Sequence, residues 1–177
     1  MSKIKKIVLT AILIAISIIL NRFISIKTEL LVISFTFVPI MMSAIWLGPK
    51  YSILIASLSD LIGALLFPFG PYFPGFTLNA AISGLIYGLL LYNKGNEMTN
   101  KKLIIMLTIS SVLQLFLVNV FLTPLWLKIL YGKAYWAVLT SRIVAQIIMF
   151  PIHIITIYGL EKFSRPFMKK YLFGEEA

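Results

Sequence analysis

The sequence predicts an all-α membrane protein in which six transmembrane helices form one bundle. Hydrophobic residues make up 60% of the chain and charged residues only 12%, whereas soluble domains are about 45–50% apolar and about 25% charged. Long apolar runs recur from residue 7 to residue 160, so the excess is not one terminal anchor. Asp60 and Arg142 are the charged residues that lie well inside these runs. A charge within a bilayer usually faces a protein cavity, so each is a candidate site residue.

The predicted helices are separated by short polar or Pro/Gly-rich segments, such as Gly48-Pro49-Lys50 and Phe67–Gly75. A helix that rises 1.5 Å per residue needs about 20 residues to cross a bilayer, so the second, third and fourth spans are short or tilted. Spans and loops use the whole length, which predicts one domain over residues 1–177. The predicted spans are 7–24, 32–47, 52–68, 78–93, 103–123 and 137–160.

The basic residues indicate how the bundle is oriented. If the first residues lie inside, 11 of the 16 Lys and Arg residues fall on the cytoplasmic side. The other five are Arg22, Lys27, Lys128, Lys133 and Arg142. The positive-inside rule therefore predicts that both termini are cytoplasmic. The net charge of +10 then reflects orientation and does not indicate a nucleic-acid partner.

In this orientation, the polar side chains of the spans gather toward the outer side. Residues four apart share one face of a helix, as Arg142 and Gln146 do. The candidates are Asp60 near the middle of span three, Asn79 at the outer end of span four, Asn119 and Thr123 at the outer end of span five, and Arg142 and Gln146 in the outer half of span six. This pattern predicts a polar pocket open to the outside. The alternative is that Asp60 and Arg142 form an ion pair that only stabilises packing.

Two outer segments, Phe67–Phe76 and Trp126–Trp136, are unusually rich in aromatic residues. Aromatic faces provide stacking surfaces for a flat ring, and proline stiffens the chain around them. The candidates are Phe69, Tyr72, Phe76, Trp126 and Tyr135 for stacking, and Lys128 for an anionic group near solvent. The segments therefore predict a cap for a planar, anionic ligand. An interfacial aromatic belt is the alternative.

The sequence carries no signature of catalysis. It contains no Cys, no pair of carboxylates at acid–base spacing, no Ser/His/Asp set and no cluster of metal ligands. It also lacks the phosphate-binding GxxxxGK[ST] loop, so any use of ATP belongs to another polypeptide. We therefore expect a binding or carrier protein that has no cofactor and is not an enzyme.

Several motifs resemble the S components of energy-coupling factor (ECF) transporters, which are vitamin-binding membrane subunits. Ala11-Ile-Leu-Ile-Ala15 has the small-xxx-small spacing through which this family docks. The resemblance to the folate-specific branch covers nearly the whole chain. It rests on Phe-Val-Pro-Ile-Met (37–41), Leu-Gly-Pro-Lys-Tyr (47–51), Ser-Asp-Leu-Ile-Gly (59–63), Pro-Tyr-Phe-Pro-Gly-Phe-Thr (71–77) and the Thr-Pro-Leu-Trp stretch that begins at Thr123.

The resemblance implies a multi-pass protein of the bacterial plasma membrane that captures folate or a reduced folate. Its partners would be membrane lipid, a transmembrane coupling protein and two ATPase subunits, which would use the ATP. Asp60, Asn79 or Gln146 could accept hydrogen bonds from the pterin edge, and Arg142 could hold a carbonyl or carboxylate. The alternatives are an S component for riboflavin or thiamine, a structural protein of the cell-shape machinery, and a membrane enzyme acting on lipid head groups.

Overall fold

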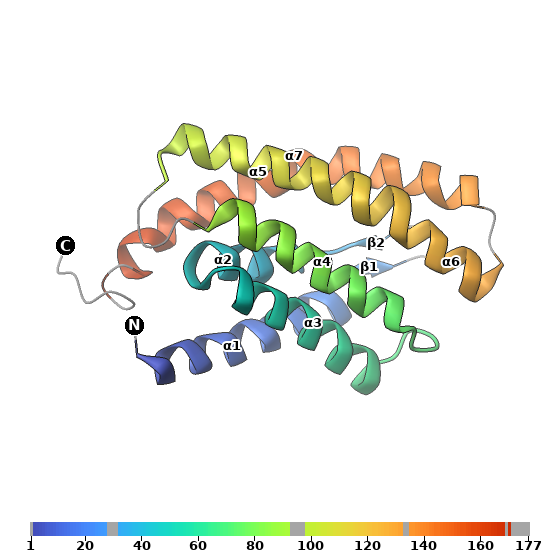
Figure 1. Cartoon of the computed structure of the whole chain (residues 1–177), viewed down its shortest axis with the longest axis horizontal. Coiled ribbons are helices and arrows are strands. Elements are labelled where there is room, and N and C mark those ends of the chain that lie inside the picture. Colours follow the sequence, from blue (N-terminus) through green and yellow to red (C-terminus); the bar gives the residue numbers. More distant parts are fainter. Residues whose placement is uncertain (1, 28–31, 93–97, 133–134, 169, 171–177) are drawn as a thin grey trace.

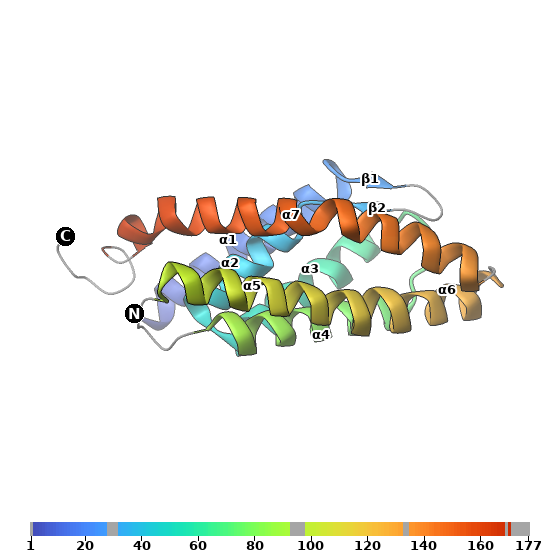
Figure 2. The same cartoon turned by 90° about the horizontal axis from the view of Figure 1, so that it is seen from above.

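The computed structural model describes residues 2–27, 32–92, 98–132, 135–168 and 170, and these form an elongated bundle of helices (Figures 1 and 2). Five helical segments of this part of the chain are long and apolar enough to cross a membrane, and a shorter apolar helix is the sixth. The predicted class of helical membrane bundle is therefore confirmed. The helices are α1 (Lys3–Arg22), α2 (Phe37–Leu47), α3 (Pro49–Leu66), α4 (Pro74–Leu91), α5 (Asn100–Gln114), the π-helix η1 (Leu115–Leu122), α6 (Thr123–Tyr131) and α7 (Tyr135–Met168).

The two ends of the bundle differ in what they contain. Helix α1 begins and α7 ends at one end, which we call the terminal end (Figure 1). Helix α3 ends and α4 begins at the opposite end, which we call the loop end (Figure 1). The aromatic segment between α3 and α4 therefore lies at the loop end, together with the start of α7.

The predicted second span, 32–47, is wrong over its first residues. Val32–Ile33 is strand β2, which pairs antiparallel with β1 (Ile26–Lys27), so the fold is not purely helical. Strand β2 is as apolar as helix α2, and hydropathy does not distinguish a strand from a helix. Helix α2 begins only at Phe37 and is 11 residues long, about 16 Å at 1.5 Å per residue. It is largely buried, with Met41 and Ala44 fully inside the main apolar core.

Helices α3 and α4 make the most extensive helix pair of the bundle. A Cβ added at Gly84 would lie 2.6 Å from the carbonyl oxygen of Ser52, and one at Gly88 would lie 2.3 Å from the Cα of Pro49. Only glycine lets the two backbones approach this closely. The small-xxx-small spacing from Gly84 to Gly88 thus serves packing inside the chain.

The fifth span is longer than the predicted range 103–123. Helix α5 continues through η1 into α6 without a break, so one helical segment runs from Asn100 to Tyr131. Trp126 and Lys128 therefore lie on a helix, and the expectation that they belong to a loop is wrong. Thr123-Pro124 does not end the helix. Pro124 has no N–H to donate, and it lies two residues after the end of the π-helix η1, in which the backbone hydrogen-bond pattern is already shifted.

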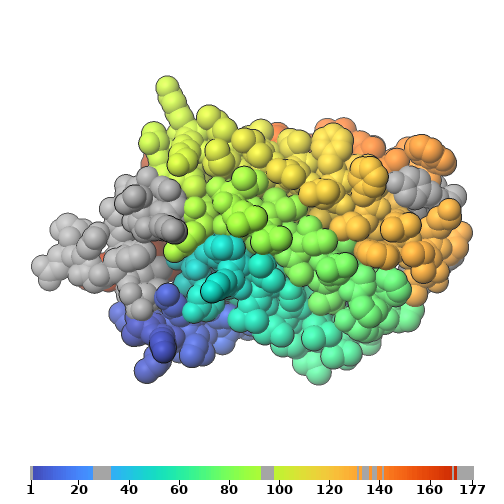
Figure 3. Space-filling view, viewed as in Figure 1, coloured from blue at the N-terminus to red at the C-terminus, as the bar shows by residue number. Residues whose placement is uncertain are grey.

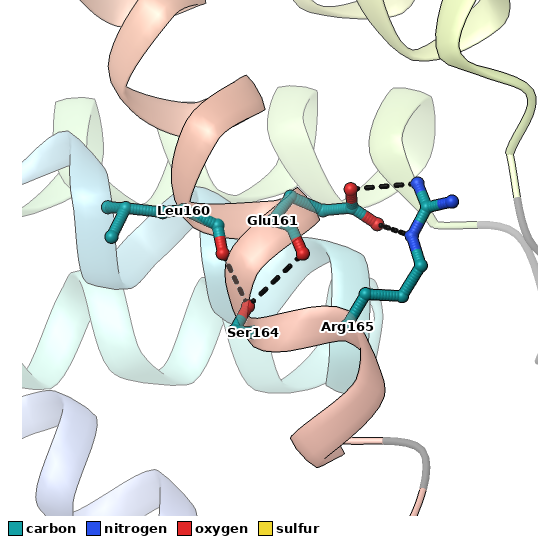
Figure 4. A network of polar contacts seen from close by, with 4 residues as sticks. All are labelled: Leu160, Glu161, Ser164 and Arg165. Atoms are coloured by element: carbon teal, nitrogen blue, oxygen red, sulfur yellow. Dashed lines mark hydrogen bonds and ion pairs between the residues drawn. The ribbon is translucent and has the colours of Figure 1, made fainter. Parts of the chain in front are cut away.

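Helix α7 also extends past its predicted end at residue 160. Glu161 accepts two hydrogen bonds from Arg165, from Nε to Oε1 and from Nη2 to Oε2, both 2.8 Å long (Figure 4). Ser164 donates to the carbonyl of Leu160 at 2.6 Å (Figure 4). Glu161 is 7% exposed, and its charge is compensated by a bidentate partner one turn later. The pair allows the helix to carry a buried acid beyond the apolar run.

Candidate functional site

Three sequence-predicted candidates meet in one buried hydrogen-bonded cluster between α4 and α6. The amide Nδ2 of Asn79 donates to Oγ1 of Thr123 at 3.0 Å. The indole Nε1 of Trp126 donates to Oδ1 of Asn79 at 3.0 Å. Thr123 donates in turn to the carbonyl oxygen of Val118, 2.8 Å away. Asn79 and Thr123 are nearly inaccessible, so this cluster fixes the position of the half-buried Trp126 ring.

The Trp126 ring is also held by the aromatic segment that precedes α4. The rings of Phe73 and Trp126 have centroids 5.6 Å apart, and Phe73 meets Phe76 edge to face at 6.0 Å. A Cβ at Gly75 would lie 2.4 Å from the Phe73 ring and 2.8 Å from the Trp126 ring. A glycine at this position therefore lets the loop and α6 come together. Phe73 is absent from the predicted site residues, although it belongs to the aromatic run.

Asp60 lies beside the same loop and is bound to α4. The hydroxyl of Thr77 donates to Oδ2 of Asp60 at 2.8 Å, and Tyr72 Oη lies 3.2 Å from the same hydroxyl. In the part of the chain that the structure describes, Asp60 forms no ion pair with Arg142. The alternative that these two charges only stabilise each other is therefore wrong.

A second polar group lies deeper in the bundle, between α4 and α5. Gln114 donates from Nε2 to Oγ of Ser83 at 2.8 Å, and Ser83 donates to the carbonyl of Asn79 at 2.7 Å. Asn119 donates from Nδ2 to the carbonyl of Gln114 at 3.3 Å. The Oε1 atom of Gln114 is buried and has no hydrogen-bond partner among the described residues. Gln114 and Ser83 were not predicted as site residues, because the sequence does not show which helices are neighbours.

The π-helix η1 is the element that presents Asn119. In a π-helix the backbone bonds run from residue i to i+5, and π segments occur often at functional sites. The Asn119 and Thr123 side chains likewise bond carbonyls five residues earlier. Thr123, which follows η1 directly, faces α4 and accepts from Asn79. The π-helical pitch before it changes the rotation of α6, the helix that carries Trp126.

Arg142 and Gln146 lie on α7, which packs on η1 and α6. Both are half-buried. The Nε atom of Arg142 is buried and has no hydrogen-bond partner among the described residues. A partly buried cation that no anion of the described residues compensates is a suitable place for an anionic or carbonyl group of a ligand.

The remaining candidates lie at the surface of the loop end. Phe69 and Tyr72 are 61% and 40% exposed, and Lys128 is exposed on α6. Tyr135 begins α7, but its side chain lies outside the described residues. In the space-filling view the green atoms of α4 meet the orange atoms of α6 at this end (Figure 3). Loop-end aromatic groups thus lie beside the Asn79–Thr123–Trp126 cluster, a combination that can bind a flat polar ligand. The described residues contain no group of three His, Cys, Asp or Glu that could hold a metal ion.

Comparison with known proteins places this arrangement in a family. The model of the family described as the ECF-type riboflavin transporter, S component, matches residues 1–162. The chain belongs to this family of S components. It is thus a multi-pass membrane protein of a transport system rather than an enzyme, and the alternatives of a cell-shape protein and a lipid-modifying enzyme are set aside.

The individual relatives carry a different vitamin in their names. The folate transporter FolT of Clostridium novyi (strain NT) is 40% identical over 162 residues, which are 92% of this chain and 91% of the relative. A folate transporter FolT of Leuconostoc mesenteroides is 35% identical over 155 residues, 85% of this chain and 80% of the relative.

Two solved structures share the fold. A crystal structure of FolT bound with folic acid superposes with a TM-score of 0.78 at 39% identity, and covers 88% of this chain and 92% of that one. The S component of a bacterial ECF transporter superposes with a TM-score of 0.67 at 23% identity, and covers 92% of this chain and 98% of that one. The second match supports the fold alone.

Proposed function

We propose that this chain binds one molecule of folate, or of a reduced folate, at the loop end as the S component of an ECF transporter. The observation that carries the proposal is its 39% identity with a FolT that was crystallised with folic acid. The relatives named folate transporter support the same substrate. The family description names riboflavin, so riboflavin, with thiamine, is the alternative substrate.

The chemistry of the loop end suits folate in three respects. Folate has a planar pterin with an N–H edge, an aminobenzoate ring and a glutamate tail with carboxylates. Asp60 has one carboxylate oxygen, Oδ1, that is not used by Thr77 and can accept from a pterin N–H. The held ring of Trp126 provides a stacking surface. Arg142 supplies an uncompensated donor for a carbonyl or carboxylate.

The other predicted residues take supporting roles in this proposal. Asn79 and Thr123 hold Trp126, while Asn119 and Gln146 offer amides from η1 and α7. Phe69, Tyr72, Phe76 and Tyr135 cover the rings, and Lys128 meets the glutamate tail near water. No cofactor is needed, because the bound vitamin is the transported substrate.

The membrane orientation follows from charge. The start of α1 and the end of α7 share the terminal end (Figure 1), where the basic residues of the termini lie, so we place the terminal end in the cytoplasm and the loop end outside. Residues 1–177 then act as one binding domain of the bacterial plasma membrane.

The partners are a transmembrane coupling protein and two ATPase subunits, docked on α1. Ala11 and Ala15 are both exposed, between exposed apolar neighbours such as Val8 and Ile19. Such a strip of small side chains lets another helix lie close. Replacing both alanines by Trp should leave folate binding by the isolated protein intact and abolish ATP-dependent uptake in vesicles that contain the full complex. Normal uptake by the double variant would exclude this docking face.

The substrate is tested by titration calorimetry of the purified protein in detergent with folate, riboflavin and thiamine. We expect one folate site per chain with nanomolar-range affinity and no heat from the other two vitamins. Binding of riboflavin or thiamine without binding of folate would reassign the substrate. Mass spectrometry of small molecules that co-purify with the protein provides an independent check.

A further inference from the structure

Gln114, the last residue of α5, is hydrogen-bonded to its neighbours through both its side chain and its backbone. Its Nε2 donates to Oγ of Ser83 on α4 at 2.8 Å, and its carbonyl oxygen accepts from Nδ2 of Asn119 on η1 at 3.3 Å. Asn79 on α4 is bonded in the same double way. Its carbonyl oxygen accepts from Ser83 at 2.7 Å, and its Nδ2 donates to Thr123, the first residue of α6, at 3.0 Å. The two residues thus join α4, α5, η1 and α6.

These bonds close on themselves through η1. The hydroxyl of Thr123 donates to the carbonyl oxygen of Val118 at 2.8 Å, and Val118 precedes Asn119 in the chain. The bonds therefore lead from α5 to α4, from α4 to α6, and from α6 back through η1 to α5, and we call them the hydrogen-bond circuit. Its members Asn79, Ser83, Asn119 and Thr123 are 8% exposed or less. At such burial, a bond that is lost leaves a polar group without a partner.

The circuit has the hydrogen-bond spacing of a π-helix. The carbonyl oxygens of Gln114 and Val118 each accept from a side chain five residues later, that of Asn119 and that of Thr123. The backbone bonds of a π-helix have this same spacing. In an α-helix, which has 3.6 residues per turn, residue i+5 lies about 140° around the axis from residue i. The two side-chain bonds therefore favour π-helical pitch in η1 over α-helical pitch.

The pitch of η1 sets the rotation of α6, which carries Trp126. Trp126 lies three residues after Thr123, and its Nε1 donates to Oδ1 of Asn79 at 3.0 Å. Asn79 is thus bonded to Ser83 through its backbone and to Trp126 through its side chain. A change at Gln114 therefore reaches the Trp126 ring by two routes, one through α4 and one through η1.

We propose that Gln114 is a positioning residue of the binding site, which together with Ser83 holds η1 in π-helical pitch and so directs the Trp126 ring. The inference rests on the proposed function, in which this ring is the stacking surface for the vitamin. Gln114 acts through α4 and η1 and needs no contact with the ligand. Its Nε2 is the atom that matters, because it supplies the bond to Ser83.

The other polar atom of the Gln114 side chain argues against a role in packing alone. Its Oε1 is buried and has no hydrogen-bond partner among the described residues. A buried acceptor without a partner lowers stability, so an apolar side chain of similar length would stabilise the bundle more. The glutamine is therefore explained by what it positions.

The test follows the fluorescence of Trp126 and the affinity for folate in the same variants. The chain has three Trp residues, so Trp46→Phe with Trp136→Phe leaves Trp126 as the reporter, and all variants are compared in this background. Gln114→Met and Ser83→Ala should each shift the Trp126 emission of the ligand-free protein. Each should weaken folate binding about twofold to tenfold, the equivalent of one neutral hydrogen bond. The melting temperature of Gln114→Met should not fall, because this change also removes Oε1.

Three control variants separate positioning from other roles. Ser110→Ala removes another buried hydroxyl of α5, one whose bond runs to Leu107 within the same helix, so emission and affinity should stay at the parent values. The double variant Gln114→Met/Ser83→Ala should lose no more affinity than the larger of the two single changes, because both break one contact. Added to Trp126→Phe, Gln114→Met should have no further effect on folate affinity.

Three results would overturn the positioning role. The first is an unchanged Trp126 emission in both Gln114→Met and Ser83→Ala, and the second is a shifted emission with unchanged folate affinity. The third is an equal loss of affinity from Gln114→Met with and without Trp126→Phe, because Gln114 would then act on the ligand without Trp126. Failure of the unsubstituted protein to bind folate would instead contradict the proposed function, and the ligand-free emission would still test the circuit.

Discussion

Replacing Arg142 by alanine separates a ligand-binding role from a structural one. Arg142 has a buried Nε without a hydrogen-bond partner, and it forms no ion pair with Asp60 in the described part of the chain. Removing it therefore breaks no ion pair among the described residues and takes away a cation that is costly to bury. We expect the melting temperature of the substrate-free protein to stay the same or to rise.

The affinity of Arg142→Ala for folate should fall, although its melting temperature does not. Truncating one partner of a buried, hydrogen-bonded charge contact costs about 2–5 kcal/mol, which corresponds to a loss of about 30-fold to a few thousandfold in affinity. Calorimetry with folate and thermal unfolding without it give the two quantities. Asp60→Asn should not rescue Arg142→Ala, because the two side chains are not paired. An Arg142→Ala protein that melts lower and binds folate with unchanged affinity would refute the reasoning.

Lys128→Ala is the matched control for Arg142→Ala. It removes a positive charge from the same end of the bundle, but from an exposed position. Exposed ion pairs are worth about 0–1 kcal/mol, so the loss of affinity should stay below about fivefold. It should also shrink as salt is raised, because salt screens exposed charges.

Four further substitutions test the packing and the hydrogen bonds. Gly84→Ala places a Cβ 2.6 Å from a backbone oxygen of α3 and should lower the free energy of unfolding by about 1–3 kcal/mol in a denaturant titration. Gly159→Ala is its control: a Cβ at Gly159 has no heavy atom of another described residue within 4 Å, so this change should be neutral or stabilising. Trp126→Phe leaves Oδ1 of Asn79 without its indole donor and should lower stability by about 1–3 kcal/mol and weaken folate binding; equal affinity for the two proteins would exclude a role for the held ring. Thr77→Val removes the donor to Asp60 while keeping the side-chain shape, so folate affinity measured by calorimetry should change while helicity by circular dichroism does not.

The sequence by itself determined the class of the protein and the approximate place of its spans. Hydropathy measures the free energy of transfer into lipid, and that quantity depends on local composition alone. The same local character marked Asn79, Thr123 and Trp126 as unusual for a membrane segment. Hydropathy overestimated the length of the second span, because a strand such as Val32–Ile33 is as apolar as a helix.

Only the tertiary structure decided which of these side chains meet. The spacing of residues along one helix gives their shared face, but it does not give the rotation of that helix or the identity of its neighbours. Asp60 therefore pairs with Thr77 across the α3–α4 contact rather than with Arg142, and Arg22 reaches the loop because Gly63 leaves room for it. Trp126 joins Asn79 because the π-helix continues the fifth span into α6, and that continuation depends on packing between helices that are distant in sequence.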